Sequence, residues 1–191
     1  MEIAKLIAHL TSAIWLFIPL RQRGTKYFYY FLINAISSAV LLINSFNLFH
    51  PAYLYLGQGF FLIISLFDFK KLPNYIFILL GILGVSILLP FLISIKIIPP
   101  LLIIEHIIIF LIILKKTLQY FAQFEKLVLF HFVLLLFVIS LITRFYVIIQ
   151  NIRTGIIFFY LTTALGILIG IYFLFYNEKN SFKISLSSVK N

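Results

Sequence analysis

The chain has 191 residues, of which 63% are hydrophobic and only 10% are charged, and its mean hydropathy is +1.16. A soluble domain has roughly 25% charged residues, and a chain of this size has too little interior to bury so much apolar surface. The formal charge of +10 does not predict a nucleic-acid partner, because Lys and Arg gather in the cytoplasmic loops of membrane proteins. The absence of cysteine excludes disulfides, thiolate metal sites and thiol catalysis.

Seven long apolar runs follow one another along the chain, separated by short gaps that contain charged residues, prolines or turn residues. About 20 apolar residues in a helix cross the hydrocarbon core of a bilayer, so each run is a candidate transmembrane helix. The first run lacks a small-residue cleavage site, and we expect it to be a retained helix rather than a signal peptide. The predicted helices cover residues 3–20, 27–46, 53–69, 75–94, 99–116, 127–150 and 156–176.

The basic residues are distributed very unevenly over the gaps. Eleven of the fifteen lie in the first, third and fifth gaps or in the polar tail, which would all face one side of the membrane. Because short cytoplasmic loops are enriched in Lys and Arg, this bias predicts an outside N-terminus, a cytoplasmic C-terminus and an odd number of helices. The four remaining basic residues are Lys5, Lys96, Arg144 and Arg153.

The predicted protein is therefore all-α and polytopic, with seven transmembrane helices. Residues 1–176 form a single bundle, and residues 177–191 form a short polar cytoplasmic tail whose serine-rich composition predicts flexibility. We expect a multi-pass protein of the cell membrane, which we take to be a bacterial inner membrane. The lipid bilayer is its first partner.

A few polar residues interrupt the apolar runs at similar depths. With a rise of about 1.5 Å per residue, they lie about 14–18 Å from the nearest basic residue on the inner side. This shared depth predicts a polar layer near the membrane centre where a small solute could bind. Its members are His9, Gln58, Glu105 and His106.

Glu105 is the acidic residue that lies deep inside an apolar run. A charge at this depth costs a few kcal/mol, so such a residue usually faces a cavity or a partner, or else is protonated. Arg144 lies near the outer end of the predicted helix 127–150, about 27 Å above Lys126, and leans inward. It is the predicted charge partner, with His9 and His106 as alternatives. Both a functional role for Glu105 and a purely structural ion pair or hydrogen bond are consistent with this pattern.

Two further clusters have more than one interpretation. Arg21, Arg23 and Lys26 in the first gap are either topogenic charges or a contact site for anionic lipid, phosphate or a cytoplasmic partner. His9 and His106 have nearly matched depths, as the two axial ligands of a haem would require, but intramembrane histidines more often hydrogen-bond a neighbouring helix. We therefore expect no cofactor and no metal.

No catalytic motif is present, so we assign no catalytic residues and favour a protein that is not an enzyme. An unfamiliar intramembrane enzyme that uses Glu105 and a histidine stays open. The leading class is a small-solute-binding membrane protein, either a transporter or a sensor. The alternative is a non-catalytic subunit or scaffold that binds another membrane protein, a cytoplasmic protein or a second copy of itself, through the small face of Gly166 and Gly170 or the basic gaps.

The gaps after the first and fifth runs are similar to each other. They read Arg-Gly-Thr-Lys-Tyr-Phe over 23–28 and Lys-Lys-Thr-Leu-Gln-Tyr-Phe over 115–121. With seven predicted helices, this layout resembles the small PQ-loop and sugar-efflux transporters, and the resemblance implies two parallel three-helix repeats. The chain lacks the Pro-Gln dipeptide of that family, since Pro19 is followed by Leu20. The sequence therefore does not place the chain in that family.

Overall fold

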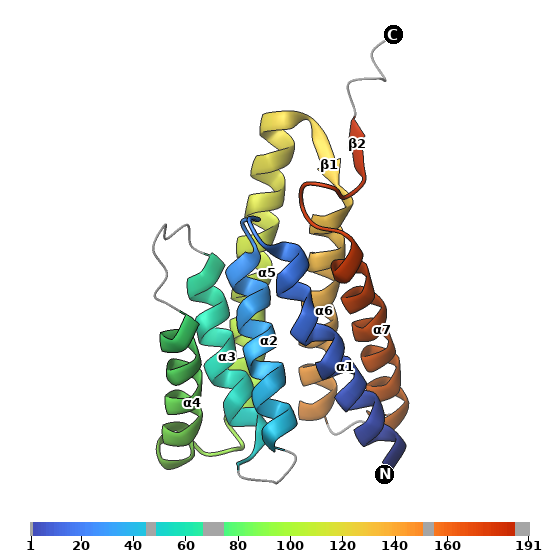
Figure 1. The fold of residues 1–191 in the computed structure, drawn as a ribbon. Helices are drawn as coiled ribbons and strands as arrows, with labels where there is room; N and C mark the ends of the chain where they lie inside the picture. The colour runs from blue at the N-terminus through green and yellow to red at the C-terminus, as the bar shows by residue number, and fades with distance from the viewer. Residues whose placement is uncertain (1, 45–48, 67–74, 151–154, 186–191) are drawn as a thin grey trace.

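The computed structural model describes residues 2–44, 49–66, 75–150 and 155–185. This part of the chain is almost entirely α-helical, with seven helices and one two-stranded ribbon, as Figure 1 shows. The helices are α1 (Glu2–Gln22), α2 (Phe28–Ile43), α3 (Pro51–Leu66), α4 (Tyr75–Leu92), α5 (Ile98–Phe124), α6 (Leu129–Ile149) and α7 (Gly155–Phe175). The predicted all-α class and the seven helices are confirmed, with small shifts at most helix ends.

Six of the helices form a closed ring, and the seventh lies outside it. Helix α1 packs on α2 and α7, α2 packs on α3, α3 packs on α5, and α6 closes the ring between α5 and α7. Helix α4 packs on the outer side of α3, with a smaller contact to α2, and lies at the edge of the bundle in Figure 1. The interior of the ring is therefore bounded by the six ring helices, and α4 packs outside it.

Helix α5 is longer than the sequence predicts. It has Pro99 and Pro100 in its first turn and ends at Phe124, where the following Glu125 caps it with a left-handed backbone of φ 51°. The prediction that it ends at Lys115 and Lys116 is wrong. No glycine or proline follows these lysines before Phe124, so nothing stops the helix, and it projects about two turns further.

The polar tail is folded where the structure describes it. Strand β1 (Lys126–Val128) pairs antiparallel with β2 (Lys183–Ser185), and the Leu129 N–H donates to the Phe182 carbonyl at 3.0 Å. The Ser181 hydroxyl accepts the Phe130 N–H at 2.9 Å and lies 2.7 Å from the Tyr172 hydroxyl. The expectation of a flexible tail is wrong over residues 177–185, because the tail fills backbone hydrogen bonds that α6 would otherwise leave open.

Buried aromatic side chains fill the interior of the helix bundle toward one of its ends. Trp15 of α1 stacks on Phe137 of α6 with ring centroids 4.4 Å apart, and Phe31 of α2 meets Phe173 of α7 at 4.8 Å. Phe130 of α6 contacts Phe173 at 5.2 Å. This aromatic cluster of Trp15, Phe31, Phe130, Phe137 and Phe173 closes the interior of the bundle on that side.

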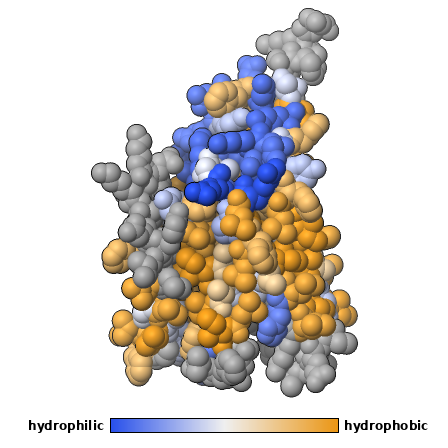
Figure 2. Space-filling view, viewed as in Figure 1, coloured by the Kyte–Doolittle hydropathy of each residue, from blue (hydrophilic) through white to orange (hydrophobic). Residues whose placement is uncertain are grey.

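The same end carries the hydrophilic surface. Figure 2 shows hydrophilic residues over the α1–α2 connection, the projecting end of α5 and the tail, and hydrophobic residues over the helices below them. The first gap, the fifth gap and the tail thus share one end, whereas Lys70 and Lys71 of the third gap lie outside the described residues. Within the described ranges, two helices, Ile98–Phe124 and Leu129–Val147, are long and apolar enough to cross a membrane by length and composition.

Candidate functional site

The ring of six helices encloses a cavity of about 580 Å³. Every ring helix contributes lining residues, and none of the described lining residues belongs to α4. The aromatic cluster bounds the cavity toward the basic end, and His50 and Ile95, from the connections at the opposite end, also line it. Its polar lining comprises His9, Thr11, Ser12, Asn34, Ser37, Ser38, His50, Tyr55, Gln58, His106, Ser140, Arg144, Thr162 and Thr163.

Four of the five predicted ligand-binding residues line this cavity. His9 comes from α1, Gln58 from α3, His106 from α5 and Arg144 from α6. The depth estimate, which assumed straight helices, placed His9, Gln58 and His106 in one layer and Arg144 nearer the outer face. The alternating direction of the helices explains why residues so far apart in the sequence meet.

Two side-chain amides, those of Gln58 and Asn34, are joined by a hydrogen bond in one wall of the cavity. The Gln58 amide nitrogen donates to Asn34 Oδ1 at 2.8 Å, and the Asn34 amide nitrogen donates to the Tyr30 carbonyl at 2.8 Å. Gln58 Oε1 is buried and makes no hydrogen bond with the described residues. The Gln58 carbonyl is therefore a buried acceptor without a partner, on a residue that lines the cavity.

Ser37 adds a second group of this kind. It lies one turn along α2 from Asn34, is 1% exposed, and its hydroxyl has no hydrogen-bond partner in the described part of the chain. By contrast, the Ser140 hydroxyl donates to the Phe137 carbonyl at 2.7 Å. Ser37 thus retains both its donor and its acceptor capacity for a molecule in the cavity.

Aromatic rings form the wall on the side of α5 and α6. The Phe145 ring lies 5.2 Å from the His106 ring and 6.3 Å from the Tyr55 ring, measured between centroids. His106 Nδ1 lies 2.8 Å from the Leu102 carbonyl, so Nδ1 carries the hydrogen and a neutral His106 presents Nε2 as an acceptor. Because Arg144 precedes Phe145, it lies on α6 close to the level of Tyr55 and His106.

Glu105 is the predicted ligand-binding residue that does not line the cavity. Its carboxylate packs against α3 at Gly59, where it occupies the space that a Cβ atom would take. One of its oxygens, Oε2, is buried and has no hydrogen-bond partner among the residues described. The structure therefore does not bring Glu105 to Arg144, because consecutive residues point about 100° apart on a helix and His106 takes the inward position.

The predicted contact residues of the first gap are divided between two roles. Arg21 Nε donates to the Phe175 carbonyl at 3.1 Å, which ties the end of α1 to the end of α7. Arg23 is exposed, and Lys26 lines a second pocket at the basic end. Gln22, which the sequence reasoning missed, is fully buried, and its amide donates to the Phe173 and Tyr176 carbonyls at 2.9 Å each.

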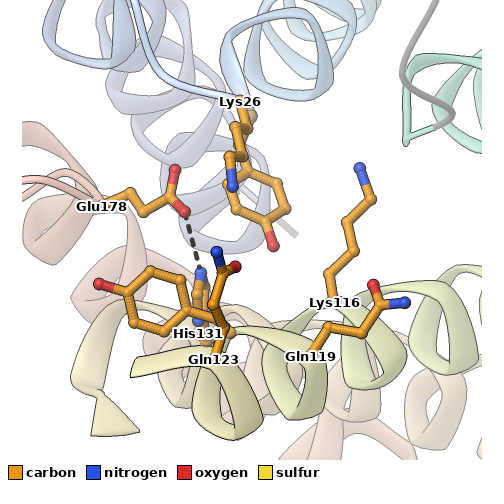
Figure 3. Close-up of a pocket in the computed structure, with 8 residues that line it drawn as sticks. Lys26, Lys116, Gln119, Gln123, His131 and Glu178 are labelled. Carbon is orange, nitrogen blue, oxygen red and sulfur yellow. Dashed lines mark ion pairs between the residues drawn. The ribbon is translucent and has the colours of Figure 1, made fainter. Parts of the chain in front are cut away.

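The second pocket has a volume of about 130 Å³ and lies between the α1–α2 connection, α5, α6 and the tail. Figure 3 shows its centre, where Glu178 Oε1 of the tail lies 3.5 Å from His131 Nε2 of α6. Neither His131 ring nitrogen makes a regular hydrogen bond with the described residues, so this contact is mainly electrostatic. The lining residues are Lys26, Tyr27, Lys116, Gln119, Tyr120, Gln123, His131 and Glu178.

Two opposing effects act on the carboxyl of Glu178. Burial raises its pKa, whereas contact with His131 and the positive charge of Lys26 lower it by more, so the pKa lies below its ordinary value. The sequence contained a signal for this pocket, since positions 116, 119, 120 and 123 recur with helical spacing. The sequence prediction did not use this spacing, because it ended the fifth helix at Lys115 and Lys116.

Neither protein-family models, nor curated proteins, nor solved structures gave any match to this chain. Among the residues described, no group of three or more His, Cys, Asp or Glu is arranged to hold a metal ion. The polar groups that line the cavity are amides, hydroxyls, imidazoles and the Arg144 guanidinium.

Proposed function

We propose that the protein is a multi-pass membrane protein that binds a small polar solute in the cavity between its six ring helices, as a transporter or a sensor. In this proposal all seven helices span a cell membrane, with the basic end in the cytoplasm and the N-terminus outside. The cavity is then accessible from the outer side and is closed toward the cytoplasm by the aromatic cluster.

The apolar surface supports the membrane part of the proposal. Every described helix carries large hydrophobic side chains that are mostly exposed, such as Phe17 on α1, Phe60 on α3, Phe91 on α4 and Leu161 on α7, which are 57–84% exposed. A monomeric soluble protein rarely exposes such contiguous apolar surface. The hydrophilic cap at one end agrees with the positive-inside rule, which assigns that end to the cytoplasm.

The observation that carries the binding proposal is the pair of unsatisfied polar groups, Gln58 Oε1 and Ser37 Oγ, which belong to residues that line one cavity. A buried polar group without a hydrogen bond costs about 1–3 kcal/mol, and this proposal assigns water or a solute in the cavity as the partner of these groups. A helix contact that serves only for packing has no need of a space of this size with hydroxyl and amide groups around it.

Cysteine accessibility tests this proposal without knowledge of the solute, because the natural chain contains no cysteine. Ser38 lines the cavity, and Ser38→Cys changes its size very little. We expect a membrane-impermeant methanethiosulfonate reagent, added from the outer side, to label Ser38→Cys in intact cells. The matched control is Ile87→Cys on α4, a position that is 60% exposed on the apolar surface and that lipid should shield.

Equally slow labelling of both variants would show that no water-filled path reaches the cavity, and it would favour the alternative of a subunit or scaffold. Labelling of Ser38→Cys from the cytoplasmic side as well would indicate alternating access, and hence a transporter. Labelling from the outer side only is the result expected for a sensor.

A further inference from the structure

We infer that the solute of this cavity is a flat molecule that carries a lactam or ureide group, with an N–H and a C=O on neighbouring atoms at its edge. The inference rests on the proposed solute binding and specifies its substrate class. It follows from the direction of the hydrogen bonds in one wall, from the position of Ser37 and from the aromatic lining.

The side-chain amides of this wall have a defined orientation. The Asn34 amide nitrogen donates to the Tyr30 carbonyl at 2.8 Å, so Asn34 Oδ1 is the atom that accepts from the Gln58 amide nitrogen at 2.8 Å. The remaining atom, Gln58 Oε1, is therefore an oxygen, and it is buried without a hydrogen-bond partner among the described residues. It can only accept, and an N–H group of the solute is its donor.

The Ser37 hydroxyl requires the opposite kind of group. Ser37 is 1% exposed, and its hydroxyl makes no hydrogen bond within the described part of the chain. Because a buried O–H group without an acceptor is costly, this hydroxyl donates to a C=O group of the solute. A solute with donors alone, or with acceptors alone, would leave one of the two residues without its partner.

The two unsatisfied residues are close enough for one amide group. Ser37 lies three residues from Asn34 on α2, which corresponds to about 4.5 Å along the helix axis, and Gln58 is hydrogen-bonded to Asn34. Hydrogen bonds of about 2.9 Å on either side of the solute can cover one helical turn. The N–H and the C=O of one amide can therefore meet Gln58 and Ser37 together.

Flat aromatic surfaces line the same cavity. Trp15 and Phe137 stack with ring centroids 4.4 Å apart, and the Tyr55 and Phe145 rings lie 6.3 Å apart; all four residues belong to the lining. Aromatic rings favour offset-stacked or edge-to-face contacts with another flat ring. A planar lactam or ureide ring can pack on these surfaces while its edge reaches the polar wall.

An ammonium group is a poorer donor for this lining. No Asp or Glu is among the described residues that line the cavity, so an ammonium group would lose its hydration without a carboxylate to replace it. The N–H of a neutral amide satisfies Gln58 Oε1 without this cost.

Pairs of isomers that differ only in the position of a methyl group test the inference. The first pair is 5,6-dimethyluracil, which keeps its N–H groups, and 1,3-dimethyluracil, which has none. The second pair is 4-methyl-2-quinolone and 1-methyl-2-quinolone, which have a larger ring. Binding to the full-length protein in detergent is measured by calorimetry, with resorcinol and glycerol as hydroxyl donors that have no C=O. In at least one pair, the isomer with N–H should bind about fivefold to a hundredfold more tightly, because methylation leaves a buried acceptor unpaired.

Variants then assign the two hydrogen bonds to their residues. Gln58→Met removes the acceptor, and it should bind both isomers of a pair about equally. Ser37→Ala removes the donor to the C=O group, which both isomers possess, so it should weaken binding of both by about twofold to tenfold. The matched control is Ser86→Ala on α4, a buried serine outside the ring whose hydroxyl donates to the Ile82 carbonyl, and it should bind like the natural protein. If Gln58→Met does not fold, the isomer pairs on the natural protein and Ser37→Ala still decide the matter.

Equal binding of the isomers in every pair that binds would overturn the inference. So would tighter binding of resorcinol or glycerol than of the N–H isomers, although solute binding would then stand. An undiminished preference for the N–H isomer in Gln58→Met would overturn the assignment to Gln58. If none of the probes binds, the inferred substrate class is wrong, whereas the proposed function is decided separately by the labelling of Ser38→Cys.

Discussion

Glu105 and His106 are consecutive residues of α5 whose side chains lie in different places, one against α3 and the other in the cavity lining. His106 lines the cavity, and Glu105 lies against Gly59 of α3, where the missing side chain leaves room for its carboxylate. The α3–α5 contact thus combines a glycine with an acidic side chain. It keeps the Glu105 carboxylate out of the lining of the cavity.

The close fit at Gly59 leads to a prediction about stability. A Cβ atom at Gly59 would meet the Glu105 carboxylate, so Gly59→Ala should destabilise the protein by about 1–3 kcal/mol, the usual range for overpacking. The change is measured as a lower midpoint of thermal unfolding in detergent. Combining it with Glu105→Ala should restore part of the loss, because the obstructing carboxylate is then absent.

Gly84 of α4 is the matched control for this substitution. A Cβ atom there meets no atom within 4 Å, and alanine is the better helix former by about 1 kcal/mol, so Gly84→Ala should be neutral or stabilising. If Gly59→Ala behaves like Gly84→Ala, the α3–α5 contact is looser than the structure shows.

The hydrogen bond between Gln58 and Asn34 should appear as an energetic coupling between α2 and α3. We expect Asn34→Leu and Gln58→Leu each to destabilise the protein and the double variant to lose less than the sum. The coupling energy should be about 0.6–2 kcal/mol, the range for side-chain hydrogen bonds between membrane helices. A double-mutant cycle of unfolding measures it, and a coupling near zero would mean that the two amides do not interact in solution.

The sequence was sufficient for the parts of the fold that depend on composition and period. The apolar runs gave the seven helices, and the polar interruptions at matched depth gave His9, Gln58 and His106, which line one cavity together with Arg144. This worked because antiparallel helices of similar length align residues of equal depth. Depth alone, however, does not give the direction of a side chain around its helix axis, which is why Glu105 was misplaced.

Other elements depend on contacts between distant segments. The β1–β2 pairing joins residues that are more than 50 positions apart, and neither strand has an alternating pattern long enough to be seen in the sequence. Gln22 was overlooked between two arginines because it looked like part of a solvated loop. Its burial is visible only when the end of α7 is placed beside it.

The contact between His131 and the carboxyl of Glu178 predicts a dependence of stability on pH. The pKa of Glu178 is lower in the folded protein than its ordinary value of 4.5, so its ionised form stabilises the fold. This stabilisation is complete above the ordinary pKa and is lost as the pH falls through the lower pKa of the folded state. Glu178→Gln should therefore reduce the free energy of unfolding at pH 7 by about 1–3 kcal/mol, as expected for a lost charged contact, and have a smaller effect once the pH falls below the folded-state pKa of Glu178.

The control for Glu178 is Glu125→Gln, which removes the same charge from an exposed position at the same end of the protein. We expect little change in stability from it at either pH. Equal effects of the two substitutions at pH 7 would show that the net charge of the basic end, rather than the contact with His131, determines the stability.

The last prediction concerns the attachment of α7 to α1. The final carbonyls of a helix have no partner within the helix, and here the buried Gln22 amide donates to those of Phe173 and Tyr176 at 2.9 Å each. Gln22→Met keeps the size of the side chain but removes both donors. It should destabilise the protein by about 1–3 kcal/mol, since two buried carbonyls lose their added partner. Gln123→Met, at an exposed position of α5, should be nearly neutral.

Hydrogen exchange provides the deciding measurement. Gln22→Met should increase exchange at the C-terminal end of α7, whereas α3 and α4, on the other side of the bundle, should exchange as in the natural protein. A uniform increase over all helices would mean that Gln22 stabilises the whole bundle rather than the end of α7.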